Sequence, residues 1–82
     1  MASDHNRDKE RAYPDFMLMI RKSWTYAKLT AAETERLLHA IDFAKDHCTS
    51  GTYFQRWDTF NAVYVAFLAG LGYTNQLHWR DA

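Results

Sequence analysis

Cysteine, glycine and proline are scarce in this chain of 82 residues. The single cysteine, Cys48, cannot form a disulfide within the chain, and no Cys-x-x-Cys motif occurs. The three glycines match no phosphate-binding loop or dinucleotide fingerprint, and the Gly-x-Ser-x-Gly motif of many hydrolases is absent as well. Paired catalytic carboxylates are not evident either. We therefore expect a protein that is not an enzyme and that needs no cofactor.

An excess of charge of one sign is also lacking, since ten Lys and Arg residues balance ten Asp and Glu residues. The chain thus lacks the broad basic footprint that supplies most non-specific affinity for nucleic acid. The longest apolar run extends from Phe60 to Tyr73, includes Asn61, and is shorter than the roughly 20 residues that a membrane helix needs. Residues 1–12 are polar and do not resemble a signal peptide. We expect a cytoplasmic protein without a membrane span.

Aromatic side chains, in contrast, are abundant, with three Trp, five Tyr and five Phe. Each buries roughly 150 to 250 Å² when packed, so even a small domain can assemble a core from them. Pro14 and Asp15 fit the first turn of a helix, and apolar residues follow them at spacings of three and four. This pattern predicts a helix over residues 14–27, with an inner face formed by Tyr13, Phe16, Met17, Ile20, Trp24 and Ala27.

Two capping boxes predict where two further helices begin. Thr30 is followed three residues later by Glu33, and Thr52 by Gln55, so each pair can satisfy two backbone N–H groups at a helix start. Gly70 suits the end of the last helix. We expect helices over residues 31–47 and 53–70. Their inner faces are predicted to hold Thr34, Leu37, Leu38, Ile41, Ala44 and Cys48 in the first, and Tyr53, Trp57, Phe60, Tyr64, Phe67, Leu68 and Leu71 in the second.

These elements predict an all-α fold, in the form of a compact three-helix bundle. Residues 1–12 have almost no apolar side chains and are expected to form a flexible, disordered N-terminal arm. Residues 13–82 are expected to form one helical domain. Its C-terminal tail, from Tyr73 onward, carries Leu77 and Trp79, and we expect it to pack back on the core.

The best candidates for metal ligands are His39, His47 and Cys48, with His78 or Asp46 as additions. His39 and His47 lie on one predicted helix, and their separation along its axis is about 12 Å at 1.5 Å per residue. A single ion cannot bridge this distance unaided. We expect no metal site.

An aromatic residue away from the predicted core suggests a binding surface. Phe43 falls nearly opposite the inner face of its helix, on a strip with Arg36, His39, Ala40 and His47. Aromatic and arginine side chains are enriched in binding hot spots, so Arg36, His39, Phe43 and His47 are candidate partner-binding residues. Two alternatives stay open, namely incidental exposure of Phe43 and packing of another segment, such as the tail, upon it.

A second candidate surface involves the first helix. Leu18, Met19 and Tyr26 fall outside its inner face, near Arg21, Lys22 and Lys28, which makes Met19, Lys22 and Tyr26 further partner-binding candidates. The alternative is that this helix is wedged between two neighbours and packs on both sides.

The predicted helix over residues 53–70 also carries a strip of mostly small side chains, formed by Gln55, Thr59, Ala62, Ala66 and Ala69. Small residues allow a close approach of another helix, so we interpret this strip as internal packing or, less often, as the seam of a homodimer.

The lengths of the last two helices and the short connection between them also fit a helix-turn-helix motif, in which Gln55 and Arg56 would read base edges. The second of these helices is apolar around most of its circumference, however, and its few charges nearly cancel. Binding to nucleic acid is therefore the less favoured hypothesis.

Four segments of the sequence carry a resemblance to known proteins, namely residues 24–30 (WTYAKLT), 51–58 (GTYFQRWD), 61–73 (NAVYVAFLAGLGY) and 78–80 (HWR). In these segments the chain resembles small proteins of phages and conjugative elements in Firmicutes-type bacteria. The resemblance spans residues 16–80, while the N-terminal arm departs from it. That group has no established activity, so no functional residue is carried over.

The resemblance implies a context rather than a chemistry, because small proteins of mobile elements often block host defence systems or regulate the element itself. Our leading hypothesis is a mobile-element accessory protein that binds a host protein stoichiometrically, as an inhibitor of a defence nuclease such as a CRISPR-Cas effector. The alternatives are a small DNA-binding regulator of the helix-turn-helix type and a structural homodimer.

Overall fold

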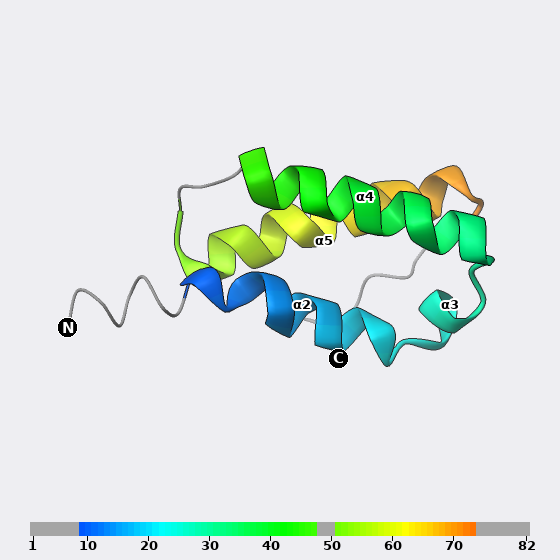
Figure 1. Ribbon diagram of the computed structural model, residues 1–82, viewed down its shortest axis with the longest axis horizontal. Helices are drawn as coiled ribbons and strands as arrows, with labels where there is room; N and C mark the ends of the chain where they lie inside the picture. The colour runs from blue at the N-terminus through cyan, green and yellow to red at the C-terminus, as the bar shows by residue number, and fades with distance from the viewer. Residues whose placement is uncertain (1–8, 48–50, 74–82) are drawn as a thin grey trace.

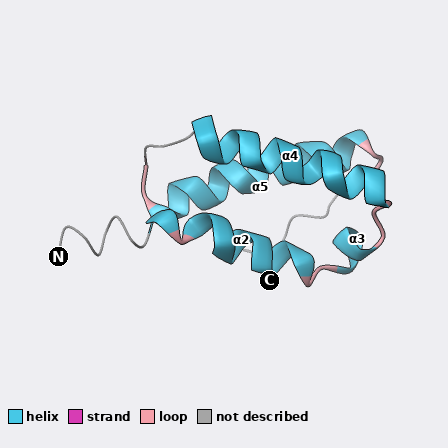
Figure 2. Ribbon diagram, in the orientation of Figure 1, coloured by secondary structure: helices cyan, strands magenta, loops and turns pink. Residues whose placement is uncertain are grey.

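The computed structural model describes residues 9–47 and 51–73 of the chain. Within these ranges the fold is all-α, as predicted, with helices α2 (Ala12–Arg21), α3 (Trp24–Ala27), α4 (Ala31–His47) and α5 (Tyr53–Gly70) (Figures 1 and 2). No helix in the described part is long and apolar enough to cross a membrane. The predictions for Cys48, for the tail residues Leu77 and Trp79, and for most of the arm lie outside the described residues.

Helix α5 lies between the other two long helices. Figure 1 shows α2 and α5 running in the same direction, with α4 antiparallel to both. The main packing contacts join α2 to α5 and α4 to α5, while the short α3 packs against α2. The N-terminal turns of α2 and α5 and the C-terminal turn of α4 consequently lie at the same end of the molecule.

The predicted single helix over residues 14–27 is wrong, because the chain leaves helical geometry at Ser23. This residue adopts extended backbone angles, φ −80° and ψ 141°, and its Oγ accepts a hydrogen bond from the Tyr26 backbone N–H at 3.1 Å. It is therefore an N-cap that starts a new helix. The Ser23 hydroxyl also lies 3.2 Å from the Tyr64 hydroxyl of α5. This hydrogen bond connects the break between α2 and α3 to a buried residue of the core. Four helices thus occupy the described residues where three were predicted.

This break changes which side chains of the segment face inward. Trp24 and Ala27 were expected on the inner face, but both are exposed, and Thr25 is buried instead. The Lys28 ammonium lies 4.1 Å from the centroid of the Trp24 ring, a cation–π contact at the surface. The helical periodicity that holds up to Ile20 does not continue past the cap.

The boundary of the N-terminal arm also needs correction. Ala12 was assigned to the arm, but it is the first residue of α2 and is fully buried. Lys9 and Glu10, just before it, also have helical geometry. The helical domain therefore begins before Tyr13, the first residue predicted for it.

Both predicted capping boxes are confirmed. The backbone N–H of Thr30 donates to the Glu33 carboxylate at 2.9 Å, and the Glu33 N–H donates back to the Thr30 hydroxyl at 3.1 Å. Thr52 and Gln55 repeat this exchange at 2.8 and 3.2 Å. Gly72 has φ +95°, a left-handed conformation suited to glycine, just after the end of α5.

The core centres on Phe16 of α2. Its ring packs edge-on against Trp57 and Tyr64, with centroids 5.2 and 6.1 Å away, and in a tilted arrangement against Phe60 at 5.9 Å. Such aromatic contacts add to the free energy gained from burial alone. Among the described residues, the other fully or largely buried apolar side chains are Ala12, Met17, Ile20, Leu37, Ile41, Ala44 and Leu68. The inner faces predicted for α4 and α5 are therefore largely confirmed within the described part.

Tyr13 connects α2 to α4. Its hydroxyl donates a hydrogen bond to Asp42 Oδ1, and the Lys45 ammonium lies 4.5 Å from the centroid of its ring. Burial, together with the hydrogen bond to the Asp42 carboxylate and its negative charge, raises the pKa of Tyr13 to about 12. The edge of the same ring packs on Phe60, with centroids 5.8 Å apart, so Tyr13 contacts α4 and α5 together.

The position of Phe16 predicts that Phe16→Ala lowers the free energy of unfolding by about 3 to 5 kcal/mol, because it removes a fully buried aromatic side chain. Urea or thermal unfolding followed by circular dichroism measures the change. Leu18→Ala, on the exposed side of the same helix, is the control and should change stability by less than about 0.5 kcal/mol. Equal effects of the two substitutions would contradict this description of the core.

The raised pKa of Tyr13 predicts a loss of stability in alkaline solution. The unfolded chain releases the Tyr13 proton near pH 10, whereas the folded chain holds it to about pH 12, so this contribution is complete below about pH 10 and is lost between pH 10 and 12. In Tyr13→Phe the free energy of unfolding should fall less steeply over this interval. An unchanged slope in the variant would show that Tyr13 ionises normally.

Candidate functional site

The predicted strip on α4 is exposed. Arg36, His39, Phe43 and His47 all have solvent-accessible side chains, and Phe43 exposes 58% of its surface. The opposite side of this helix faces the core, and its residues Leu37, Ile41 and Ala44 are buried. The prediction that Phe43 lies away from the core is confirmed, and the role of the strip in binding remains a prediction.

The Phe43 and His47 rings are stacked on one another, one helical turn apart. Their centroids lie 3.9 Å apart with an angle of 17° between the ring planes. His47 Nδ1 lies 2.8 Å from the Phe43 carbonyl oxygen, and because a carbonyl only accepts hydrogen bonds, Nδ1 carries the proton. The two contacts restrict the rotation of both rings. An aromatic group already ordered in the free protein loses less conformational entropy when a partner covers it.

The second predicted patch is divided by the structure. Lys22 is exposed at the break between α2 and α3, whereas Met19 and Tyr26 are half-buried and pack against the core. These two side chains therefore take part in packing at the edge of the core. Leu18 and Arg21 of α2 are exposed as well.

The strip of small residues on α5 faces solvent. Ala62, Ala66 and Ala69 are exposed, because α2 and α4 both pack on other sides of α5. The prediction that this strip forms internal packing is wrong within the described part of the chain. Its use as the seam of a homodimer remains a prediction.

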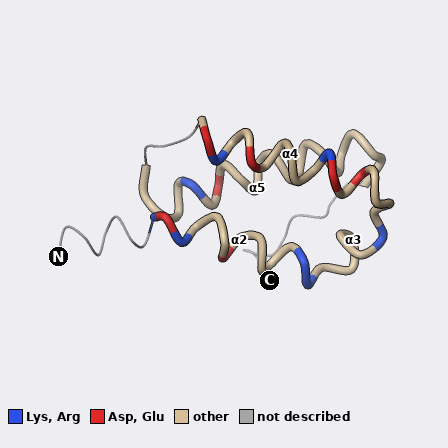
Figure 3. The backbone as a smooth tube through the Cα atoms, viewed as in Figure 1, with Lys and Arg blue, Asp and Glu red and all other residues tan. Residues whose placement is uncertain are grey.

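In the part of the chain that the structure describes, charges are distributed without a broad patch of one sign. Figure 3 shows acidic and basic residues interspersed along α4 and at the start of α2 and α5. The sequence between Asp15 and Glu33 contains Arg21, Lys22 and Lys28 and no acidic residue. Among the described residues, no group of three or more His, Cys, Asp and Glu side chains could hold a metal ion.

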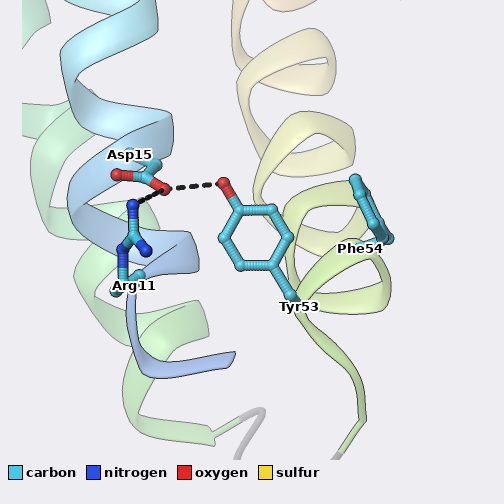
Figure 4. Close-up of a pocket in the computed structure, with 4 residues that line it drawn as sticks. All are labelled: Arg11, Asp15, Tyr53 and Phe54. Carbon is cyan, nitrogen blue, oxygen red and sulfur yellow. Dashed lines mark hydrogen bonds and ion pairs between the residues drawn. The ribbon is translucent and has the colours of Figure 1, made fainter. Parts of the chain in front are cut away.

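A hollow between α2 and α5 was not predicted from the sequence. It has a volume of about 240 Å³ and is lined by Arg11, Asp15, Tyr53 and Phe54 (Figure 4). The Tyr53 hydroxyl donates a hydrogen bond to Asp15 Oδ2 at 2.7 Å, and Arg11 Nη2 lies 3.8 Å from the same oxygen. Burial and the hydrogen bond to Asp15 raise the pKa of Tyr53, which therefore remains a neutral donor at physiological pH.

One sequence signal could have indicated part of this hollow. Phe54 falls outside the inner face predicted for residues 53–70, as Phe43 does on its own helix, and Phe54 exposes 70% of its surface. The pairing of Asp15 with Tyr53 could not be predicted in the same way, because 38 residues separate them.

The exposure of Phe43 predicts that Phe43→Ala changes the free energy of unfolding by no more than about 0.5 kcal/mol. Thermal unfolding of the variant and the parent chain measures the difference. Leu37→Ala, on the buried side of the same helix, should cost about 2 to 5 kcal/mol and serves as the comparison. A large fall in melting temperature for Phe43→Ala would mean that Phe43 contributes to the core.

Comparisons with protein families, with curated proteins and with solved structures found no match. The resemblance to mobile-element proteins therefore remains a prediction. The observations that bear on function are therefore the exposed side chains, above all the aromatic ones of α4 and α5.

Proposed function

We propose that this chain is a protein-binding module without catalytic activity of its own, and that it binds its partner stoichiometrically through the exposed strip of α4. The observation that carries the proposal is the exposed Phe43 ring, stacked on His47. Arg36, His39 and His47 surround it with polar groups, and all three are exposed. A central aromatic anchor with a polar rim is the usual anatomy of a protein interface.

The energetics favour Phe43 as the anchor over the other strip residues. Covering its exposed apolar surface gains free energy at about 25 cal/mol per Å². Arg36 offers planar, bidentate hydrogen bonding to a partner carboxylate. The histidines lose part of their hydration when covered and must find new hydrogen bonds, so they contribute more to specificity than to affinity.

The partner class in this proposal is a host protein in the cytoplasm, in particular a defence nuclease such as a CRISPR-Cas effector. Its support is the predicted resemblance of residues 16–80 to proteins of phages and conjugative elements. The mechanism is steric occlusion, in which one bound copy covers a functional surface of the nuclease and no turnover takes place.

Both alternatives would use the surface of α5. A helix-turn-helix regulator would present Gln55 and Arg56 to DNA, but Arg56 is half-buried and the exposed Asp58 would face the phosphates. A homodimer would close over Ala62, Ala66 and Ala69, which are exposed. Each alternative gives a different result in the experiment below.

The test is a pull-down with the tagged chain from a lysate of a Firmicutes host, run with and without added nuclease, followed by titration of the purified partner. We expect one retained protein that survives nuclease treatment and binds with 1:1 stoichiometry. Phe43→Ala should weaken its affinity by about tenfold or more, as for a hot-spot residue.

Leu18→Ala is the matched control, since it removes a large apolar side chain of another helix that is as exposed as Phe43, at 58%. It should leave the affinity for this partner unchanged. Retention of nucleic acid alone, with binding that falls steeply as salt is added, would replace the proposal with the DNA regulator. A mass of two chains in solution, without a retained partner, would replace it with the homodimer.

A further inference from the structure

The hollow between α2 and α5 has two aromatic walls. The rings of Tyr53 and Phe54 lie nearly perpendicular, with centroids 5.1 Å apart and an angle of 85° between their planes. Figure 4 shows the Tyr53 ring between Phe54 on one side and the Arg11 and Asp15 side chains on the other. The face of an aromatic ring carries partial negative charge, so such walls attract cations.

A carboxylate adds full negative charge to these walls. Asp15 lies in the first turn of α2 and is partly exposed. Its Oδ2 accepts the hydrogen bond from the Tyr53 hydroxyl, and Oδ1 takes part in neither this contact nor the ion pair with Arg11. The hydrogen bond holds the carboxylate beside the rings, because Tyr53 is itself packed against the core.

The positive group that now accompanies Asp15 is held loosely. Arg11 Nη2 lies 3.8 Å from Asp15 Oδ2, which is too long for a hydrogen bond, and the Arg11 side chain is 62% exposed. Exposed ion pairs of this kind contribute little to stability. The Asp15 carboxylate can therefore accommodate a guanidinium, and displacing the Arg11 guanidinium from it costs little free energy.

We propose that this hollow binds the guanidinium of an arginine side chain presented by another polypeptide. Asp15 would pair with the guanidinium, one of the two rings would stack on its flat face, and the other ring, nearly perpendicular to the first, would contact its edge. Arginine fits better than lysine because its planar group can stack on a ring while it donates two parallel hydrogen bonds to a carboxylate. Arg11 acts as an internal competitor that moves aside when the arginine enters.

This site is separate from the strip on α4 and goes beyond the function proposed above. It uses side chains of α2 and α5 together with Arg11 at the start of α2, whereas Phe43 and His47 belong to α4. The opposite hypothesis is an anion site in which Arg11 holds a carboxylate. The two hypotheses predict opposite effects of removing Arg11, which makes them separable by one substitution.

The experiment is an NMR titration of the full chain with Nα-acetyl-L-arginine amide, whose only charge is the guanidinium. We expect saturable shifts at Asp15, Tyr53 and Phe54. Phe54→Ala should weaken binding by roughly two- to fivefold, the range for a surface cation–π contact. Asp15→Asn should weaken it by about tenfold or more. Arg11→Ala should strengthen it, because the competing guanidinium is gone.

Phe43→Ala is the matched control and should bind the probe as the parent chain does. Loss of binding in Arg11→Ala, or preferential binding of Nα-acetyl-L-glutamate amide, would overturn the proposal in favour of an anion site. Shifts that do not saturate, or that Phe54→Ala leaves unchanged, would overturn it as well. The titration needs no protein partner, so its failure is distinguishable from a failure of the pull-down.

Discussion

The packing of Phe16, on α2, against the aromatic side chains of α5 is the interaction on which the rest of the structure depends. Trp57, Phe60 and Tyr64 surround this one ring, and α4 adds its own buried stripe along another side of α5. In a chain of 82 residues few other side chains are available to form a core. The described aromatic residues that stay exposed, Phe43 and Phe54 among them, are therefore candidates for function.

The two candidate sites lie at the same end of the molecule but are formed by different helices. The last turn of α4, which carries His47, and the first turn of α5, which carries Phe54, lie at the same end of the fold (Figure 1). At each site an exposed phenylalanine is held by a neighbouring ring, His47 in one case and Tyr53 in the other. A ring contact of this kind favours one arrangement of the side chains in the free protein, which lowers the entropic cost of binding.

The sequence predicted those features that depend on local chemistry. The starts of α4 and α5 follow from capping boxes that span three residues, and the exposure of Phe43 follows from helical periodicity within an uninterrupted helix. The break at Ser23 was missed because a serine is tolerated inside helices, and its contact with Tyr64 joins residues 41 positions apart. The hollow beside Phe54 was missed for the same reason, since it forms only when α2 packs on α5.

The central claim is that the outward face of α4 at Phe43 contacts a protein partner. The most direct measurement places a photo-crosslinking amino acid in place of Phe43, and separately in place of exposed Leu18 on α2, and irradiates host cells that express each chain. We predict one cross-linked protein of defined mass from position 43 and none from position 18. Equal cross-linking from both positions, or none from position 43, would contradict this claim.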